Sequence, residues 1–186
     1  MSDSPQPPAI LLTGSPGVGK STVIQRLVAR LGPAAGGFYT CELRQAGRRT
    51  GFEIVTLAGR RDYLATTDPA ITFSRTAPFG RYRVNLAGLD RLAVPALHQA
   101  AAEKQVVIVD EIGPMELLSS QFGEVVQELL DGPALILGTI VQRRHPLADR
   151  VKAHPRVKLI QVTPANRDRL PTELFAELGR YQAKPE

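Results

Sequence analysis

One glycine-rich segment of the chain has the residue types and the spacing needed to hold phosphate groups. Gly14-Ser15-Pro16-Gly17-Val18-Gly19-Lys20-Ser21 satisfies the pattern G-x-x-x-x-G-K-[ST] in full. Glycine lets such a loop turn sharply, so that successive backbone N–H groups point inward around a phosphate. We expect Lys20 to reach the β- and γ-phosphates of a nucleotide and the Ser21 hydroxyl to ligand Mg²⁺. The segment therefore predicts a nucleoside triphosphate site.

A second segment places two acids at the end of an apolar strand. Residues 106–109 are all valine or isoleucine, and Asp110 and Glu111 follow them. A strand that ends in two acids is common, but with a phosphate loop upstream we expect Asp110 to serve the metal ion. Glu111 is then the candidate general base that polarises a water in line with the γ-phosphate. An acid pair here favours attack by water over attack by a bound acceptor.

Weaker candidates follow the later strands. The Thr139 hydroxyl is a candidate contact for the γ-phosphate or the attacking water, with a capping role as the alternative. Arg143, Arg144 and Arg150 are candidates to stabilise charge on the transferring phosphoryl group, with solvated surface as the alternative.

One more pair lies after the last expected strand. Asn166 is a candidate to hydrogen-bond the base and Arg167 to stack on it. A helix N-cap is the competing role for Asn166.

The elements that must position these residues follow from hydrophobic periodicity. Continuous apolar runs predict buried strands at 9–13, 105–110, 134–140 and 157–162. Helical spacing predicts helices over 21–31, 89–103, 119–130 and 171–181. Segments 36–44 and 51–57 indicate a β-hairpin whose loop is 45–50, and 82–85 a further short strand, whereas 60–80 shows no clear pattern. Apolar strands separated by amphipathic helices predict an α/β fold, a three-layer α/β/α sandwich around a mainly parallel sheet with the hairpin antiparallel at its edge.

Composition limits the class of protein. The 186 residues predict one domain over 9–181, between a disordered tail at 1–8 and a flexible C-terminus at 182–186. The polar, proline-rich start does not resemble a signal peptide, and no apolar run approaches the ~18 residues of a membrane span. Cys41 is the single cysteine, so no disulfide framework is possible. We expect a cytoplasmic protein without a membrane partner; its oligomeric state stays open, with a monomer favoured.

The positive charge does not by itself indicate a nucleic-acid partner. The chain carries 23 basic and 18 acidic residues, a formal net charge of +5. The arginines occur as short pairs spread along the sequence, and aromatic residues make up only 5%. This distribution favours solvated surface, or a pocket for a polyanionic small molecule, over a nucleic-acid stacking platform.

Several segments taken together resemble the THEP-type nucleoside-triphosphatases, a family that includes the cancer-related nucleoside-triphosphatase. They are GSPGVGKST, GGFYTCELRQAGRRTGFEIV, VVIVDEIGPMELLS, HPLADR and TPANRDRLP, in this order, and the similarity covers residues 9–175. GGFYT and DEIGPMEL are far more specific to that family than the phosphate loop is.

The resemblance implies a P-loop NTPase fold with an extra strand between the Walker A and Walker B strands. It also implies slow, Mg²⁺-dependent hydrolysis of ATP, GTP and other nucleoside triphosphates with broad base tolerance. Carried over to this sequence, phosphate and metal would be bound by Gly17, Gly19, Lys20, Ser21 and Thr22, and Asp110 and Glu111 would serve metal and water. Two alternatives remain: a nucleotide or small-molecule kinase on the same fold, and a nucleotide-dependent module associated with RNA.

Overall fold

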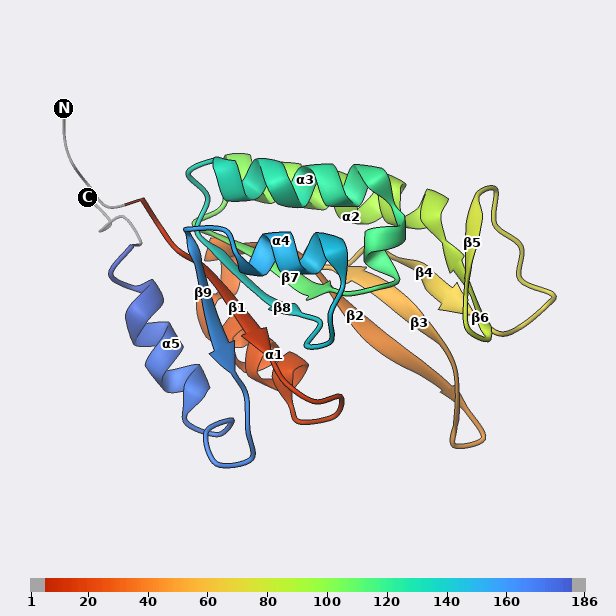
Figure 1. Cartoon of the computed structure of the whole chain (residues 1–186), viewed down its shortest axis with the longest axis horizontal. Helices are drawn as coiled ribbons and strands as arrows, with labels where there is room; N and C mark the ends of the chain where they lie inside the picture. The colour runs from red at the N-terminus through yellow and green to blue at the C-terminus, as the bar shows by residue number, and fades with distance from the viewer. Residues whose placement is uncertain (1–5, 182–186) are drawn as a thin grey trace.

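A computed structural model describes residues 6–181, in which one mixed sheet lies between two layers of helices (Figure 1). The described strands form a 9-stranded sheet in the order β5-β6-β4-β3-β2-β7-β8-β1-β9. Five of them make the parallel part: β1 (Ala9–Thr13), β2 (Ala35–Gln45), β7 (Val106–Ile112), β8 (Ile136–Ile140) and β9 (Val157–Gln161). Strand β8 lies between β1, which precedes the phosphate loop, and β7, which carries the two acids. The expected extra strand between these two strands is therefore confirmed.

The antiparallel part is larger than the sequence predicts. It consists of β3 (Arg48–Thr56), β4 (Arg61–Thr66), β5 (Thr76–Phe79) and β6 (Tyr82–Asn85). Only β3 and β6 were expected, because 60–80 has no clear pattern in the sequence. Strand β2 also differs from the expectation, since it pairs in parallel with β7 on one side and antiparallel with β3 on the other. It therefore joins the two parts of the sheet rather than lying at an edge.

The hairpin between β2 and β3 has a tighter turn than the loop expected at 45–50. Gln45 pairs with Arg48, and only Ala46 and Gly47 lie between them. Both have positive φ, 48° and 76°, which is the backbone of a two-residue turn that matches the twist of the strands. The strands consequently run almost to the tip, and Figure 1 shows β2 and β3 continuing past the end of β7.

Helices cover both faces of the sheet. Helices α1 (Lys20–Leu31) and α5 (Leu170–Leu178) pack on one face, and α2 (Leu86–Glu103), α3 (Ser120–Asp131) and α4 (Pro146–Lys152) pack on the other. Two short 3-10 turns are η1 (Gly32–Ala34) and η2 (Glu116–Leu118). Every residue of β1 is buried, because alternate side chains enter the two cores. The four expected helices are confirmed, and α2 begins earlier, where the Asn85 side chain accepts from the Gly88 N–H.

The start of the described chain is fixed to the body of the protein. The side chain of Arg156, before β9, donates to the carbonyl oxygens of Pro7, Leu129, Leu130, Gly132 and Ala134. The Pro8 carbonyl accepts from the N–H of Ile136 at 3.3 Å. Residues 6–8 of the expected tail are therefore placed, whereas residues 1–5 and the expected C-terminal end at 182–186 lie outside the described residues.

We expect Arg156→Ala to lower the free energy of unfolding by about 2–4 kcal/mol, because it leaves several partly buried carbonyl oxygens without their charged donor. The free energy of unfolding of Arg156→Lys should lie between those of the wild type and Arg156→Ala, because an ammonium group cannot reach all of these oxygens. Urea denaturation followed by circular dichroism measures the effect. Arg180→Ala on the surface is the control, and an equal loss in both variants would contradict the role of Arg156.

The fold brings the ends of three parallel strands together. Leu12 pairs with Thr139, and Val109 pairs with Gly138, so the carboxyl ends of β1, β7 and β8 lie at one level. The phosphate loop follows β1, and Asp110 is near the end of β7.

No helix in the described residues 6–181 is long and apolar enough to cross a membrane.

Candidate functional site

The phosphate loop joins β1 to α1 and depends on its glycines. Gly14, Gly17 and Gly19 have φ of 147°, 77° and 110°, values that other residues rarely adopt. A Cβ on Gly14 would lie 2.8 Å from the carbonyl oxygen of Val162, so a larger residue would displace the backbone. The sequence pattern therefore forms the strand–loop–helix unit that phosphate binding requires.

Lys20, the first residue of α1, folds back over this loop. Its Nζ donates to the carbonyl oxygens of Gly14 at 2.9 Å and Ser15 at 3.3 Å. Its ammonium group is thus held at the mouth of the loop, where a bound phosphate would replace neutral carbonyl partners with charged ones.

Asp110 forms the buried polar centre of the site. Its Oδ1 accepts hydrogen bonds from the Ser21 hydroxyl at 3.3 Å and from the Thr139 hydroxyl. Burial raises the pKa of the Asp110 carboxyl, and these two hydrogen bonds oppose the rise. Its Oδ2 is buried and has no hydrogen-bond partner among the described residues.

An unpartnered carboxylate oxygen beside a serine hydroxyl fits a hard cation such as Mg²⁺. Within residues 6–181, no group of three or more His, Cys, Asp or Glu could hold a metal ion. Mg²⁺ sites in proteins commonly use one or two protein ligands together with phosphates of the substrate. The residues that would hold the ion are Ser21 and Asp110.

Glu111 and Lys20 line the same cavity. Its volume is about 430 Å³, and its walls are Gly14, Pro16, Lys20, Glu111, Pro114, Val141, Gln142 and Arg143. Burial raises the pKa of Glu111, the charge of Asp110 raises it further, and Lys20 and Arg143 oppose this. A carboxylate with a raised pKa in a cavity that it shares with a lysine is suited to accept a proton from water.

Glu116 is a buried acid next to this cavity that the sequence could not place. Burial first, and then the charge of Glu111, raise its pKa well above the ordinary value. Hydrogen bonding with the backbone at Glu116 itself and at Gly113 opposes this rise in pKa. In the sequence, the one signal of a buried structural acid is that Glu116 lies inside the otherwise apolar segment 112–118. The contacts indicate that Glu116 holds the turn that follows Glu111.

The structure separates the candidate arginines. Arg143 lines the cavity, and its guanidinium carbon lies 5.7 Å from the centre of the Phe79 ring. Arg144 does not line the cavity. It lies near Asp149, whose pKa is lowered by a hydrogen bond from Lys152 and, to a lesser degree, by the charge of Arg144. Arg150 is exposed on α4. Of the three candidate arginines, Arg143 is thus the one that lines the cavity with Lys20 and Glu111.

Asn166 and Arg167 lie in the turn after β9. The Asn166 side chain accepts from the N–H of Thr163 at 2.8 Å and donates to the carbonyl of Gln161 at 2.9 Å. It fixes this turn and does not cap α5, whose N-cap is Arg169. Arg167 donates to the carbonyl oxygen of Val18 at 3.3 Å, so its guanidinium lies against the phosphate loop.

The remaining predicted residues belong to the loop itself. Ser15 and Pro16 are exposed at its tip, and the Ser15 carbonyl accepts from the N–H of Val18. Thr22 is exposed in the first turn of α1. Pro114, Val141 and Gln142 line the cavity without having been predicted, because their residue types carry no chemical signal.

Comparison with known proteins shows the family to which this chain belongs. The family model described as NTPase matches residues 9–175. The chain is 44% identical over 166 residues to nucleoside-triphosphatase THEP1 of Thermotoga petrophila, which covers 89% of this chain and 90% of that protein. It is 38% identical over 182 residues to the cancer-related nucleoside-triphosphatase homolog of Bos taurus, covering 91% of this chain and 95% of that protein.

Two solved structures share the fold. The crystal structure of THEP1 from Aquifex aeolicus superposes with a TM-score of 0.81 at 36% identity, covering 91% of this chain and 98% of that one. The solution structure of a human cancer-related nucleoside triphosphatase gives a TM-score of 0.78 at 36% identity, covering 95% and 100%. The chain therefore belongs to the NTPase family, whose named relatives are nucleoside-triphosphatases.

Proposed function

We propose that this enzyme hydrolyses nucleoside 5′-triphosphates, ATP and GTP among them, to the diphosphate and phosphate, slowly and with Mg²⁺. The observation that carries the proposal is the shared cavity, in which Glu111 faces Lys20 at the mouth of the phosphate loop. Family membership supports the reaction, and the resemblance to THEP-type proteins supports the slow rate. We also place the reaction in the cytoplasm, a compartment that suits a chain with one cysteine.

Each charged group has a distinct role in this proposal. The N–H groups of the loop and the Lys20 ammonium hold the phosphates and neutralise their charge. Ser21 and Asp110 hold Mg²⁺, which when bound offsets the charge that develops on the phosphate oxygens. Glu111 orients a water and takes its proton. Arg143 stabilises the charge on the transferred phosphoryl group.

We infer broad base tolerance from the contacts that Asn166 and Arg167 make in the turn after β9. Both hydrogen-bonding groups of the Asn166 side chain are engaged within its own turn. Arg167 can offer a base the flat face of its guanidinium, and stacking of this kind does not distinguish one base from another. We therefore expect similar turnover of ATP and GTP.

The test is steady-state phosphate release from ATP and GTP, with Mg²⁺ and with excess chelator. We expect release only with the metal, and no change when nucleosides, sugars and protein acceptors are added. Phosphate that appears on an acceptor, with faster nucleotide consumption, would instead identify a kinase. Release that continues in chelator would contradict the metal site at Ser21 and Asp110.

We expect Arg143→Gln to lower the turnover number by at least about tenfold, because a charged donor beside the reacting phosphoryl group is lost. Arg144→Gln removes the same charge one residue away, outside the cavity, and should change turnover by less than about twofold. Phosphate release at saturating nucleotide measures both. A loss in the Arg144 variant that equals the loss in the Arg143 variant would show that only general charge matters.

A further inference from the structure

Two hairpins at the carboxyl edge of the sheet gather arginines that are far apart in the sequence. Arg44, Arg48 and Arg49 lie at the end of the β2–β3 hairpin, Arg81 lies in the turn between β5 and β6, and Arg143 follows β8. We call these five residues the arginine surface. Residues 40–45 of β2 continue past its last pair with β7, which at about 3.3 Å per residue is a projection of about 20 Å.

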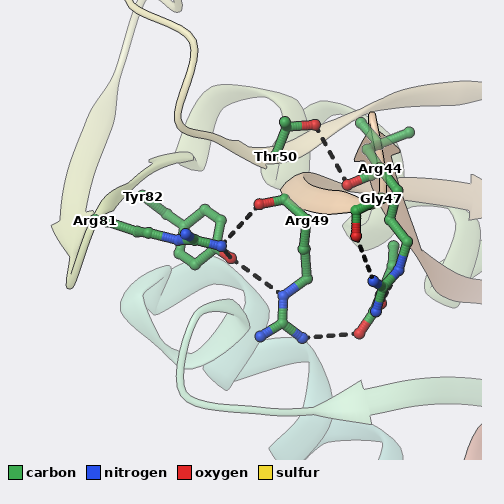
Figure 2. Close-up of polar contacts among 8 residues, drawn as sticks. Arg44, Gly47, Arg49, Thr50, Arg81 and Tyr82 are labelled. Atoms are coloured by element: carbon green, nitrogen blue, oxygen red, sulfur yellow. Dashed lines mark hydrogen bonds and ion pairs between the residues drawn. The ribbon is translucent and has the colours of Figure 1, made fainter.

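Hydrogen bonds connect the arginines of the two hairpins. Glu42 accepts from Arg44 at 2.7 Å and from Arg49 at 2.8 Å. The Tyr82 hydroxyl accepts from Arg49 at 3.2 Å and from Arg81 at 3.0 Å, and Arg81 also donates to the Arg49 carbonyl at 2.7 Å (Figure 2). The two hairpins are thus fixed to each other through their cationic side chains.

Three of these guanidinium groups lie over aromatic rings. Arg49 is 5.2 Å from the centre of the Phe52 ring, Arg81 is 5.1 Å from Tyr82, and Arg143 is 5.7 Å from Phe79. All three arginines are exposed, so the ring supports one side of each guanidinium while the side chain remains accessible to solvent. A supported, accessible guanidinium can stack on a nucleobase, and its N–H groups can donate to a phosphate in the same plane.

The charges on this surface are not balanced locally. Among the described residues, Arg44 and Arg49 share the carboxylate of Glu42, and Arg143 faces Glu111, whose pKa its charge lowers, so five arginines meet two carboxylates. The cations are all arginines rather than lysines, which favours bidentate contacts with phosphate. Because like charges held close together repel, a partner with many negative charges would stabilise this arrangement.

We propose that the arginine surface binds single-stranded nucleic acid, with phosphates on the guanidinium N–H groups and bases on their accessible faces. A single phosphate would occupy only one arginine pair, and the bases of a duplex are stacked on one another and cannot reach the guanidinium faces. Arg143 also lines the nucleotide cavity, so the strand lies next to that cavity. The binding itself needs no hydrolysis, and it shares one residue, Arg143, with the function proposed above.

The experiment is fluorescence anisotropy with labelled oligouridylate and oligothymidylate of about 12 nucleotides, with salt raised from about 50 to 200 mM. We expect binding whose logarithm falls with log salt by about 0.7 per phosphate contact. Arg48→Gln with Arg81→Gln should weaken binding at low salt by at least about tenfold and reduce that slope by about 1.4. The two probes show whether the sugar matters.

The matched control is Arg60→Gln with Arg180→Gln, which removes the same charge from the β3–β4 turn and from the end of α5. It should change affinity by less than about twofold. Equal losses in both double variants, no binding at low salt, or equal affinity for a duplex or for inorganic polyphosphate would each overturn the proposal.

Two further variants separate this site from the fold and from the nucleotide site. If the double variant is poorly folded, Arg48→Gln alone should still reduce the slope by about 0.7. Lys20→Ala should bind nucleotide about 10–100-fold more weakly but keep its affinity for the oligonucleotides. Loss of both kinds of binding in that variant would place the strand in the nucleotide cavity and overturn the separate surface.

Discussion

Glu111→Gln is expected to leave nucleotide affinity near that of the wild type and to lower the turnover number by about 10²–10⁴-fold. Glutamine has nearly the same size and keeps a polar group in the cavity beside Lys20, so the site should still accept a triphosphate. It cannot take a proton from water at neutral pH. The amide also removes a negative charge next to Asp110, so any small change in nucleotide affinity should be an increase.

Equilibrium binding of a fluorescent nucleotide and single-turnover phosphate release separate these two effects. Glu124→Gln on the exposed side of α3 is the control, since it makes the same chemical change far from the cavity. Hydrolysis at the wild-type rate would show that Glu111 is not the base. A large loss of affinity would show that the substitution disturbs the loop or the metal site, and the rate would then say nothing about proton transfer.

The sequence was sufficient to predict the centre of the site because its signals are local. The phosphate loop needs glycine at fixed positions, and three of these glycines do adopt positive φ. Asp110 follows the apolar residues 106–109 and lies near the end of β7, and parallel strands place their carboxyl ends at one edge. Lys20, Asp110 and Glu111 could thus be assigned to one site from short segments alone.

The antiparallel strands β4 and β5 could not be predicted from the sequence, and the cause is physical. Strand β5 is four residues long, contains Pro78, and pairs only with β6. Strand β4 begins with polar residues and is buried only toward its end. Such strands are stabilised by the neighbours that they pair with rather than by a pattern of their own, so a window along the sequence contains little of the information.

The arginine surface shows the same limit for function. In the sequence its arginines are scattered: the charge distribution favours solvated surface for most of them, and only Arg143 is a candidate for the phosphoryl group. The hydrogen bond from Arg49 to Tyr82 crosses 33 positions of the chain and depends on the pairing of β5 with β6. Glu116 could not be assigned from the sequence for the same reason, because its burial close to Glu111 depends on the turn formed by 112–118.

Lys20→Ala should lower nucleotide affinity by about 10–100-fold, since charge-assisted hydrogen bonds of about 1.5–3 kcal/mol are lost. Turnover of the nucleotide that still binds should fall by about 10²–10³-fold. Lys20 also faces two acids: its charge lowers the pKa of Asp110 and of Glu111, opposing the larger effect of burial. Without the lysine, the pKa of both carboxyl groups is higher, and a protonated carboxyl neither holds the metal ion nor accepts a proton from water.

The loss of binding together with turnover distinguishes Lys20 from Glu111, whose replacement should affect turnover alone. Nucleotide titration and phosphate release on the same protein samples measure both quantities. Lys158→Ala, which removes an exposed lysine paired with Glu177, is the control and should change neither. If Lys20→Ala bound nucleotide as well as the wild type, the hydrogen bonds from Lys20 to Gly14 and Ser15 would be its whole role, and it would hold the loop rather than the phosphates.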